Sequence, residues 1–187
     1  MSGLLELLAG YRPAHPAEER SLERILDLLA GVDQPFSRDT YAPGHITASA
    51  FLVDRSGRGT VLLHHVKLGI WVQPGGHLEP GDAGPAEGAL REAAEETGLA
   101  GLELAADAPR PFDLDVHDIP ARGSEPAHAH HDLRYLVMGD MRVPVSAPDG
   151  EAPRVRWFSW DEAFELPLDS NLRLGLEKAR LYVAKAR

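Results

Sequence analysis

The stretch Gly75–Leu99 reads GGHLEPGDAGPAEGALREAAEETGL and holds the clearest pattern in the chain. The pair Gly84-Pro85 predicts the start of a helix, because a proline in the first turn loses no hydrogen bond. Gly98 predicts the left-handed residue that ends this helix. Residues three and four apart are neighbours on a helix, so the sequence predicts one patch of three carboxylates: Glu92, Glu95 and Glu96.

A run of charged residues on a helix is usually a solvated surface. This cluster lies in the last turns, where each carboxylate faces the negative end of the helix dipole and repels its neighbours, at a cost of about 0.3–1 kcal/mol each when exposed. A divalent cation would relieve both penalties. Mg²⁺ is usually held by a few carboxylates together with phosphate oxygens. The pattern therefore favours a metal site that handles phosphate.

The run Arg91–Leu99 resembles the second half of the signature box of the Nudix hydrolases, an Arg-Glu-x-x-Glu-Glu-x-Gly motif followed by an aliphatic residue. The first half departs from the box in two ways. Asp82 stands where the family usually has glutamate, and eight residues separate it from Arg91, one more than the family pattern has. The extra residue falls in the turn at 83–85, which can absorb an insertion without moving the glutamates.

The resemblance extends beyond the box. Trp71–Gly76 is similar to the strand and turn before it, and Arg154–Phe158 with Asp161-Glu162 to the late strand and the helix after it, so the likeness spans about residues 45–180. It implies an α/β fold, a Nudix-type α/β/α sandwich with a mixed central sheet. It also implies a hydrolase that cleaves a diphosphate linkage in a nucleoside diphosphate linked to another moiety.

By this resemblance, Glu92, Glu95 and Glu96 hold Mg²⁺ together with the carbonyl of Gly76, and Mn²⁺ could substitute. Arg91 is expected to pair with one of the glutamates and fix its rotamer. The cation would neutralise charge developing on the diphosphate and lower the pKa of a bound water. The general base stays open between three acidic residues: Glu95, Glu125 and Glu151.

The segment His117–Tyr135 holds four of the nine histidines: His117, His128, His130 and His131. In an extended strand His128 and His130 share one face and His131 the other, so they do not automatically converge on one ion. Histidines in loops are often merely exposed, so a Zn²⁺ site is the less favoured interpretation here. A wall that faces the substrate is favoured.

The predicted substrate-binding residues are Gln73, His77, His130, Arg134 and Tyr135. His77 qualifies by its position beside the glycine turn. Arg134 would offer a fork to phosphate, and Tyr135 a ring for stacking. Core packing explains Tyr135 equally well.

Composition narrows the functional classes. With 187 residues, of which 43% are hydrophobic, the chain can form one compact domain with a real core. Its net charge of −10 argues against nucleic-acid polymers and membranes as partners, so a small nucleotide-type diphosphate must be held by local basic groups and metal. No signal pattern is present, and no apolar run approaches the roughly 20 residues that cross a bilayer, so we expect a cytoplasmic protein.

The absence of cysteine has two consequences. It rules out a disulfide framework and a thiolate site. It also argues against an isomerase of the isopentenyl diphosphate type, which shares the general fold and needs a cysteine in its active site.

We expect the chain to divide into a helical extension with a connector at 1–44 and a domain at 45–187 that resembles the Nudix hydrolases. Helices are expected at 4–8, 18–30, 85–97, 161–166 and 172–186. Besides the strand at 71–73, strands are expected at 46–54, 60–65, 102–105, 111–116, 133–138 and 155–158. The extension is expected to cover part of the core or another subunit, which leaves a homodimer open.

One alternative function is a domain that binds a nucleotide or metabolite as a sensor and does not hydrolyse it. The complete set of glutamates argues against it, and Asp82 is the only hint in its favour. Within the hydrolase class the substrate stays open between ADP-ribose-like compounds, modified nucleoside triphosphates and dinucleoside polyphosphates, because selectivity arises from loops.

Overall fold

The computed structural model describes residues 2–65, 69–105, 108–146 and 154–185. Its helices are α1 (Ser2–Ala9), α2 (Pro16–Gly31), α3 (Pro85–Thr97), α4 (Trp160–Glu165) and α5 (Ser170–Lys185). Its strands are β1 (Gly44–Asp54), β2 (Gly59–His65), β3 (Ile70–Val72), β4 (Gly75–His77), β5 (Glu103–Leu104), β6 (Asp113–Ile119), β7 (His128–Gly139) and β8 (Arg154–Ser159). None of these helices is long and apolar enough to cross a membrane.

The eight strands of the described chain form one mixed sheet around β1. On one side β1 pairs in parallel with β7 along its full length, from Gly44 opposite Ala129 to Asp54 opposite Gly139. On the other side it pairs antiparallel with β4 over its first half and with β2 near its end. Strands β5 and β6 add to β7, and β3 and β8 add to β2, all antiparallel.

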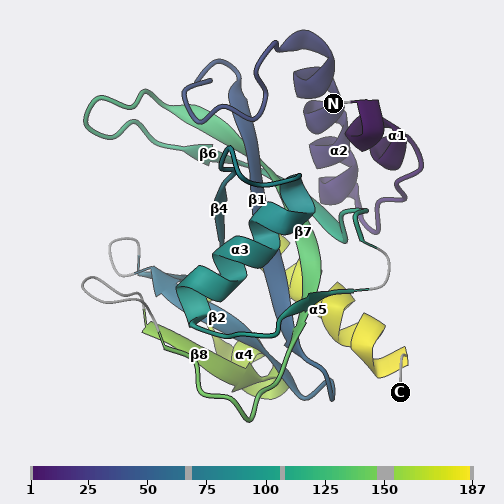
Figure 1. Cartoon of the computed structure of the whole chain (residues 1–187), viewed down its shortest axis with the longest axis vertical. Coiled ribbons are helices and arrows are strands. Elements are labelled where there is room, and N and C mark those ends of the chain that lie inside the picture. The colour runs from purple at the N-terminus through teal and green to yellow at the C-terminus, as the bar shows by residue number, and fades with distance from the viewer. Residues whose placement is uncertain (1, 66–68, 106–107, 147–153, 186–187) are drawn as a thin grey trace.

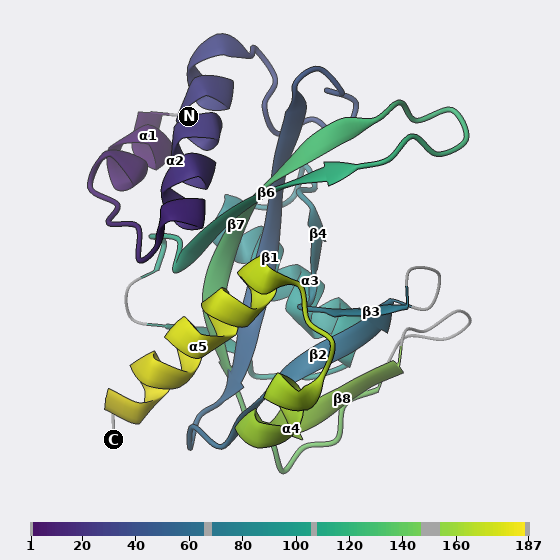
Figure 2. The same ribbon diagram turned by 180° about the vertical axis from the view of Figure 1, so that it is seen from behind.

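Helices cover both faces of this sheet (Figures 1 and 2). The alternation of side chains along β1 explains the layers, because successive residues point to opposite faces. Ile46, Ala48 and Ala50 are buried on the face covered by α3. Phe51 and Val53 are buried on the face covered by α4 and α5. The resulting α/β/α arrangement confirms the predicted fold class.

The helices α1 and α2 pack on the same face as α3 and share one core cluster with the sheet. Leu8 of α1 and Ile25 of α2 are almost completely buried there. A partly buried ion pair also holds this extension, because Lys178 Nζ of α5 donates to Glu18 Oε1 of α2 at 2.6 Å. The extension therefore covers part of the core, as its amphipathic pattern predicts.

Two details differ from the sequence prediction. The expected turn at Gly75-Gly76 is the short strand β4, with Gly75 opposite Ser49 and Gly76 opposite Ala48. A Cβ at Gly75 would lie 2.3 Å from the Cβ of Ser49, so this close pairing requires glycine. Strand β7 begins at His128 rather than at 133, because parallel pairing with β1 extends the strand through its polar first residues.

Candidate active site

Helix α3 ends and begins where the sequence predicts. Gly84 is its N-cap, with Pro85 in the first turn, and Gly98 ends it with a φ of 67° while its N–H donates to the carbonyl of Ala94 at 2.9 Å. Small buried residues on its inner face, including Ala89 and Ala93, let the helix approach β1 closely. This packing brings Glu92 and Glu96, in the later turns of the helix, to the glycines of β4.

The carboxylates of Glu92 and Glu96 lie next to the backbone of Gly75 and Gly76, where no side chain intervenes. The N–H of Gly75 donates to Glu96 Oε2 at 2.9 Å. A Cβ on Gly76 would lie 2.6 Å from Glu92 Oε1, closer than such contacts occur. Glycine at both positions is therefore what allows the backbone of β4 to share a site with these two carboxylates.

Arg91 ties the acidic residues of the box together. Its Nη1 donates to Glu92 Oε1 and to Glu95 Oε2, each at 3.0 Å. Its Nε and Nη2 donate to Asp82 at 3.0 and 3.1 Å, and Nη2 also donates to the carbonyl of His77 at 3.0 Å. The sequence predicts a pairing with one glutamate; the structure shows two glutamates and the unusual aspartate.

Burial controls the charge of these carboxylates. It raises the pKa of Glu92, and it raises the pKa of Glu96 to about 7, with repulsion from Glu92 and Glu95 adding to the effect. The hydrogen bond from Arg91 instead holds the pKa of Asp82 below its usual value. The cation-free site therefore disfavours negative charge at Glu96, which a bound cation would reverse.

The three glutamates do not converge on one point. Among the described residues, the groups of three acidic or histidine side chains with ligand atoms within 4.8 Å of one another lie elsewhere. Glu95 is the most exposed of the three, with a side chain that is 57% exposed and an Oε2 that accepts from Arg91. Glu92 and Glu96 fit a divalent cation, since they are half-buried, mutually repelling carboxylates at the glycine backbone of β4, and the carbonyl of Gly76 would be a further ligand. Glu95 joins them only by leaving Arg91.

Gln73 lies two residues before Gly75, and its side chain contacts the polar face of the sheet, opposite the face that α3 covers. Its Nε2 donates to Ser49 Oγ at 3.2 Å and to Asp132 Oδ2 at 3.3 Å. Asp132 also accepts from the hydroxyls of Thr47 and Ser49, at 3.0 and 2.6 Å. Gln73 is thus held by side chains of β1 and β7, and its side chain is half-buried.

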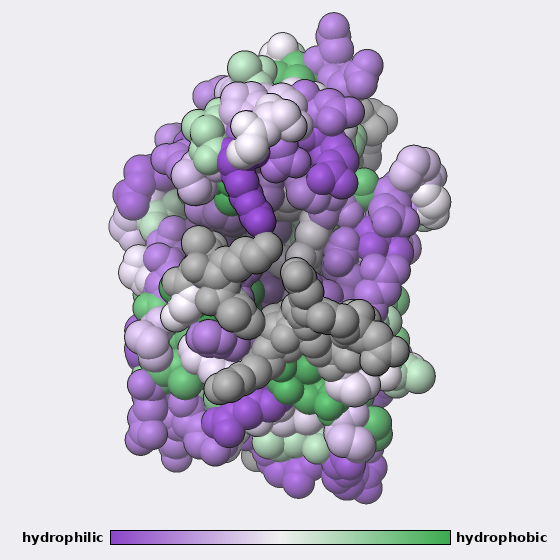
Figure 3. Space-filling view, turned by 90° about the vertical axis from the view of Figure 1, so that its left-hand side faces the viewer, coloured by the Kyte–Doolittle hydropathy of each residue, from purple (hydrophilic) through white to green (hydrophobic). Residues whose placement is uncertain are grey.

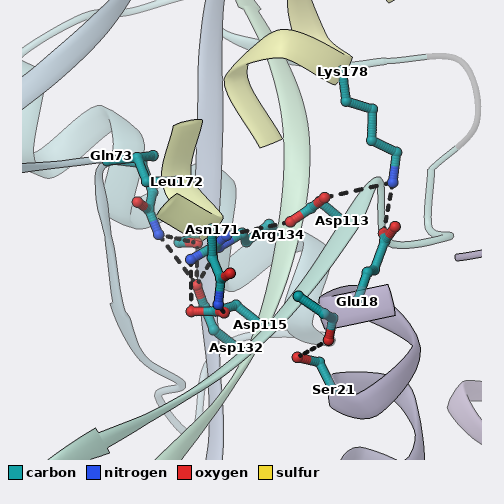
Figure 4. Close-up of polar contacts among 12 residues, drawn as sticks. Glu18, Ser21, Gln73, Asp113, Asp115, Asp132, Arg134, Asn171, Leu172 and Lys178 are labelled. Carbon is teal, nitrogen blue, oxygen red and sulfur yellow. Dashed lines mark hydrogen bonds and ion pairs between the residues drawn. The ribbon is translucent and has the colours of Figure 1, made fainter. Parts of the chain in front are cut away.

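Arg134 does not present a free fork to phosphate, contrary to the prediction from the sequence. Its guanidinium is buried and contacts Asp113, Asp115 and Asp132 at 3.3, 2.8 and 3.3 Å (Figure 4). The antiparallel register of β6 and β7 places these aspartates around it, with Asp113 opposite Arg134 itself. With three carboxylates as partners, the charge of Arg134 is already compensated inside the fold.

Tyr135 lies on the opposite face of the sheet from Arg134, because neighbouring residues of a strand point in opposite directions. Its side chain is 1% exposed and belongs to the core cluster that α1, α2 and α3 cover. The core-packing interpretation therefore holds, and the predicted stacking role for this ring does not.

His77 and His130 belong to a cluster of five imidazoles that runs across four strands. The ring of His130 lies 5.2 Å from that of His77, and further rings of the cluster surround it at 4.9 to 5.6 Å: His45, His117 and His128. Burial lowers the pKa of His77 to about 4 and that of His130 to about 3. For His117 burial also acts to lower the pKa, but the hydrogen bond to Asp115 and the charges of Asp132 and Asp115 together outweigh it and raise the value. His131 points to the other face and is buried there.

His45 is a site residue that the sequence reasoning missed. Polar residues alternate at His45, Thr47 and Ser49 within a strand that the sequence does predict, and this alternation places all three on one face. This alternation could have identified His45 from the sequence, but the strand was expected to begin only at Ile46, which left His45 outside it.

The candidate general bases differ in their surroundings. Glu95 lies in the box itself. Glu125 lies between β6 and β7, where its carboxylate is 3.8 Å from Arg38. Glu151 lies outside the described residues.

Comparison with known proteins agrees with this geometry. The sequence model of the NUDIX domain matches residues 43–178. Among curated protein sequences, none matches this chain. Solved structures with a similar fold include a Caenorhabditis elegans Ap4A hydrolase in a binary complex, with 17% identity and a TM-score of 0.55 over 75% of this chain and 98% of that one.

Two other similar structures have comparable coverage. A NUDIX-family hydrolase from Clostridium perfringens has 23% identity and a TM-score of 0.54, over 73% of this chain and 97% of its own. The NUDIX domain of Shewanella oneidensis NrtR, complexed with ADP ribose, has 19% identity and a TM-score of 0.51, over 74% and 87%. From the glutamate-bearing helix, the mixed sheet and the matching domain, we conclude that this chain belongs to the Nudix family, as a hydrolase acting on phosphoric anhydride bonds.

Proposed function

We propose that this protein is a Mg²⁺-dependent pyrophosphohydrolase that cleaves the diphosphate linkage of a nucleoside diphosphate linked to another moiety. The observation that carries this proposal is the placement of Glu92 and Glu96, two half-buried carboxylates held against the backbone of Gly75 and Gly76. Mg²⁺ or Mn²⁺ held there would neutralise diphosphate oxygens and lower the pKa of a bound water. The remaining chemistry belongs to the side chains around it.

Arg91 is the positioning residue of the site. It holds Glu92 and Glu95 from one side and is itself held by Asp82 from the other. Glu95 is the general base that the geometry supports best, because its carboxylate is exposed beside the two half-buried glutamates and can accept a proton at an oxygen. Swinging Glu95 off Arg91 would be the motion that prepares it for this role.

The substrate is proposed to lie along the polar sheet face, over Gln73, His77 and His130. His77 directly follows Gly76 in β4, but its ring lies on the other side of the strand from Glu92, with the rings of His45 and His130. A substrate with its diphosphate at the glutamates would therefore pass around β4 to place the linked moiety near the imidazoles. Burial keeps His77 and His130 neutral at physiological pH, and a neutral imidazole both donates and accepts hydrogen bonds. ADP-ribose-like compounds and dinucleoside polyphosphates fit this description, and similar structures carry the names Ap4A hydrolase and ADP-ribose complex.

The test is the release of phosphate-containing products from a panel of nucleoside triphosphates, ADP-ribose, nucleotide sugars and dinucleoside polyphosphates. Wild type is compared with Glu96→Gln, each with Mg²⁺ and with a chelator. Glu87→Gln is the matched control, because it removes one exposed carboxylate from the first turn of the same helix.

Metal-dependent cleavage that is lost in Glu96→Gln and kept in Glu87→Gln supports the proposal and names the substrate class. Binding of a panel compound by folded wild type without any cleavage would overturn it, and would favour a sensor that binds its ligand without hydrolysis.

A further inference from the structure

A second group of potential metal ligands lies outside the glutamate site. One ring nitrogen from each of His45, His128 and His130 lies within 4.8 Å of the others. His45 is the second residue of β1 and lies directly opposite His130 in the parallel register with β7. His128 precedes His130 by two residues and lies on the same face of the strand. Pairing of the two strands, distant in sequence, therefore creates the group.

Two of these histidines are oriented as metal ligands are. Nδ1 of His45 lies 3.0 Å from the carbonyl of Thr40, and Nδ1 of His128 lies 2.9 Å from the carbonyl of Pro126. A carbonyl can only accept, so Nδ1 carries the proton in each neutral ring and Nε2 offers a lone pair. Metal-binding histidines in proteins commonly have their second nitrogen fixed in this way.

His45 supplies an independent sign of a missing ligand. Its side chain is 1% exposed, and among the described residues no group forms a hydrogen bond with its Nε2. A buried polar atom left without a partner destabilises the fold, because it has lost its hydrogen bonds to water. A bound cation at this nitrogen would remove that cost.

The three rings lie close together. Their centroids lie 4.9 to 5.1 Å apart, and the rings of His45 and His128 are stacked at 29°. Neutral imidazole is the form that binds metal.

We propose that His45, His128 and His130 form a binding site for one Zn²⁺ ion. Imidazole nitrogens suit Zn²⁺, whereas Mg²⁺ prefers oxygen ligands, so the ion of this site differs in kind from that of the glutamates. Nitrogens at about 2.0–2.1 Å from a tetrahedral Zn²⁺ are roughly 3.4 Å apart, so the three rings must close by at most about 1.4 Å. His128 and His130 are half-buried at the sheet end and can rotate to supply this movement.

The ion would join three segments of the chain. It would link the start of β1, and through Thr40 the connector before it, to the β6–β7 hairpin. The surface on this side of the molecule is largely hydrophilic in its upper part (Figure 3). His77 is the nearest further imidazole, with its ring 5.0 Å from that of His45. The Zn²⁺ site therefore shares His130 with the proposed substrate face and shares no ligand with the glutamate site.

The test measures Zn²⁺ binding by the full chain, prepared without a histidine tag and stripped by a chelator. Protein is equilibrated with Zn²⁺ in excess Mg²⁺, freed of unbound ions, and its zinc content is measured by atomic emission. The variants are His45→Gln and His128→Gln, with Glu92→Gln/Glu96→Gln to remove the other site. His64→Gln is the control, since it removes a histidine of β2 whose ring contacts Trp71 instead.

We expect one Zn²⁺ per chain in wild type, in the glutamate double variant and in His64→Gln. Removing His128 should weaken binding by about 100-fold or more, since even changes that only support a ligand weaken binding by 10–100-fold. His128 is half-buried, so this variant keeps the result interpretable if His45→Gln fails to fold.

Two results would overturn the proposal. One is the absence of stoichiometric zinc in wild type. The other is zinc that is lost with the glutamates but kept in His128→Gln, which would assign the ion to the box. Because the readout is zinc content, neither result depends on whether the protein hydrolyses a diphosphate.

Discussion

Arg91 donates two hydrogen bonds to the carboxylate of Asp82, from Nε at 3.0 Å and from Nη2 at 3.1 Å. Asp82 also accepts from the N–H of Glu79 at 2.8 Å, which fixes the turn before α3. The residue that departs from the Nudix box therefore acts on the arginine rather than facing the cation ligands. Its carboxylate holds Arg91 in the position from which it reaches Glu92 and Glu95.

Replacing Asp82 by asparagine should lower kcat/KM by about 10–100-fold, as is typical when a group that orients metal ligands is lost. Steady-state kinetics with varied Mg²⁺ would measure this loss. Glu79→Gln, an exposed change in the same turn, should keep full activity. Equal activity in Asp82→Asn and wild type would remove Asp82 from the site.

Replacing Glu96 by glutamine should stabilise the cation-free protein at alkaline pH. The pKa of Glu96 is raised to about 7 in the fold, so the folded state holds a proton that the unfolded chain releases near pH 4.5. Stability is therefore lost as pH rises from about 4.5 to 7 and stays lower above that range. Glutamine cannot ionise and keeps the acceptor for the N–H of Gly75.

We expect the free energy of unfolding of Glu96→Gln to exceed that of wild type by about 1–3 kcal/mol near pH 8. Near pH 4 the two free energies should differ little. Urea denaturation with a chelator present would measure both. A variant less stable than wild type near pH 8 would show that the carboxylate is stabilising there.

Cation affinity should fall with acidity for the same reason. Below about pH 7 Glu96 carries a proton that Mg²⁺ must displace, so the apparent affinity should drop by up to about tenfold per pH unit and level off above pH 7. Isothermal titration with Mg²⁺ in two buffers of different ionisation enthalpy would count the proton released. Constant affinity between about pH 5.5 and pH 8 would contradict the raised pKa.

Removing Arg134 should destabilise the fold rather than weaken phosphate binding alone. Arg134→Met leaves Asp113, Asp115 and Asp132 buried without their cation, at an expected cost of about 3–5 kcal/mol by urea denaturation. Arg142→Met breaks only an exposed pair with Asp140 and should leave the stability close to that of wild type. Wild-type stability with a weakened substrate affinity in Arg134→Met would restore the phosphate-fork role.

Local signals in the sequence predicted most of the elements. The helix from Pro85 to Gly98 is marked by the conformational limits of proline and glycine, which act through single residues. The strand beginning near Ile46 is marked by a run rich in aliphatic and β-branched residues. Where a pattern is local, the sequence alone contains it.

The sequence by itself also determined the chemistry of the box: three carboxylates on one helix patch, with glycines before it. Only the tertiary structure decided which groups those carboxylates meet. Arg134 looked available for phosphate until the register of β6 and β7 surrounded it with aspartates. His45 looked unrelated to His130 until parallel pairing set the two opposite each other. Strand register couples residues far apart in the chain, and no local pattern encodes that distance.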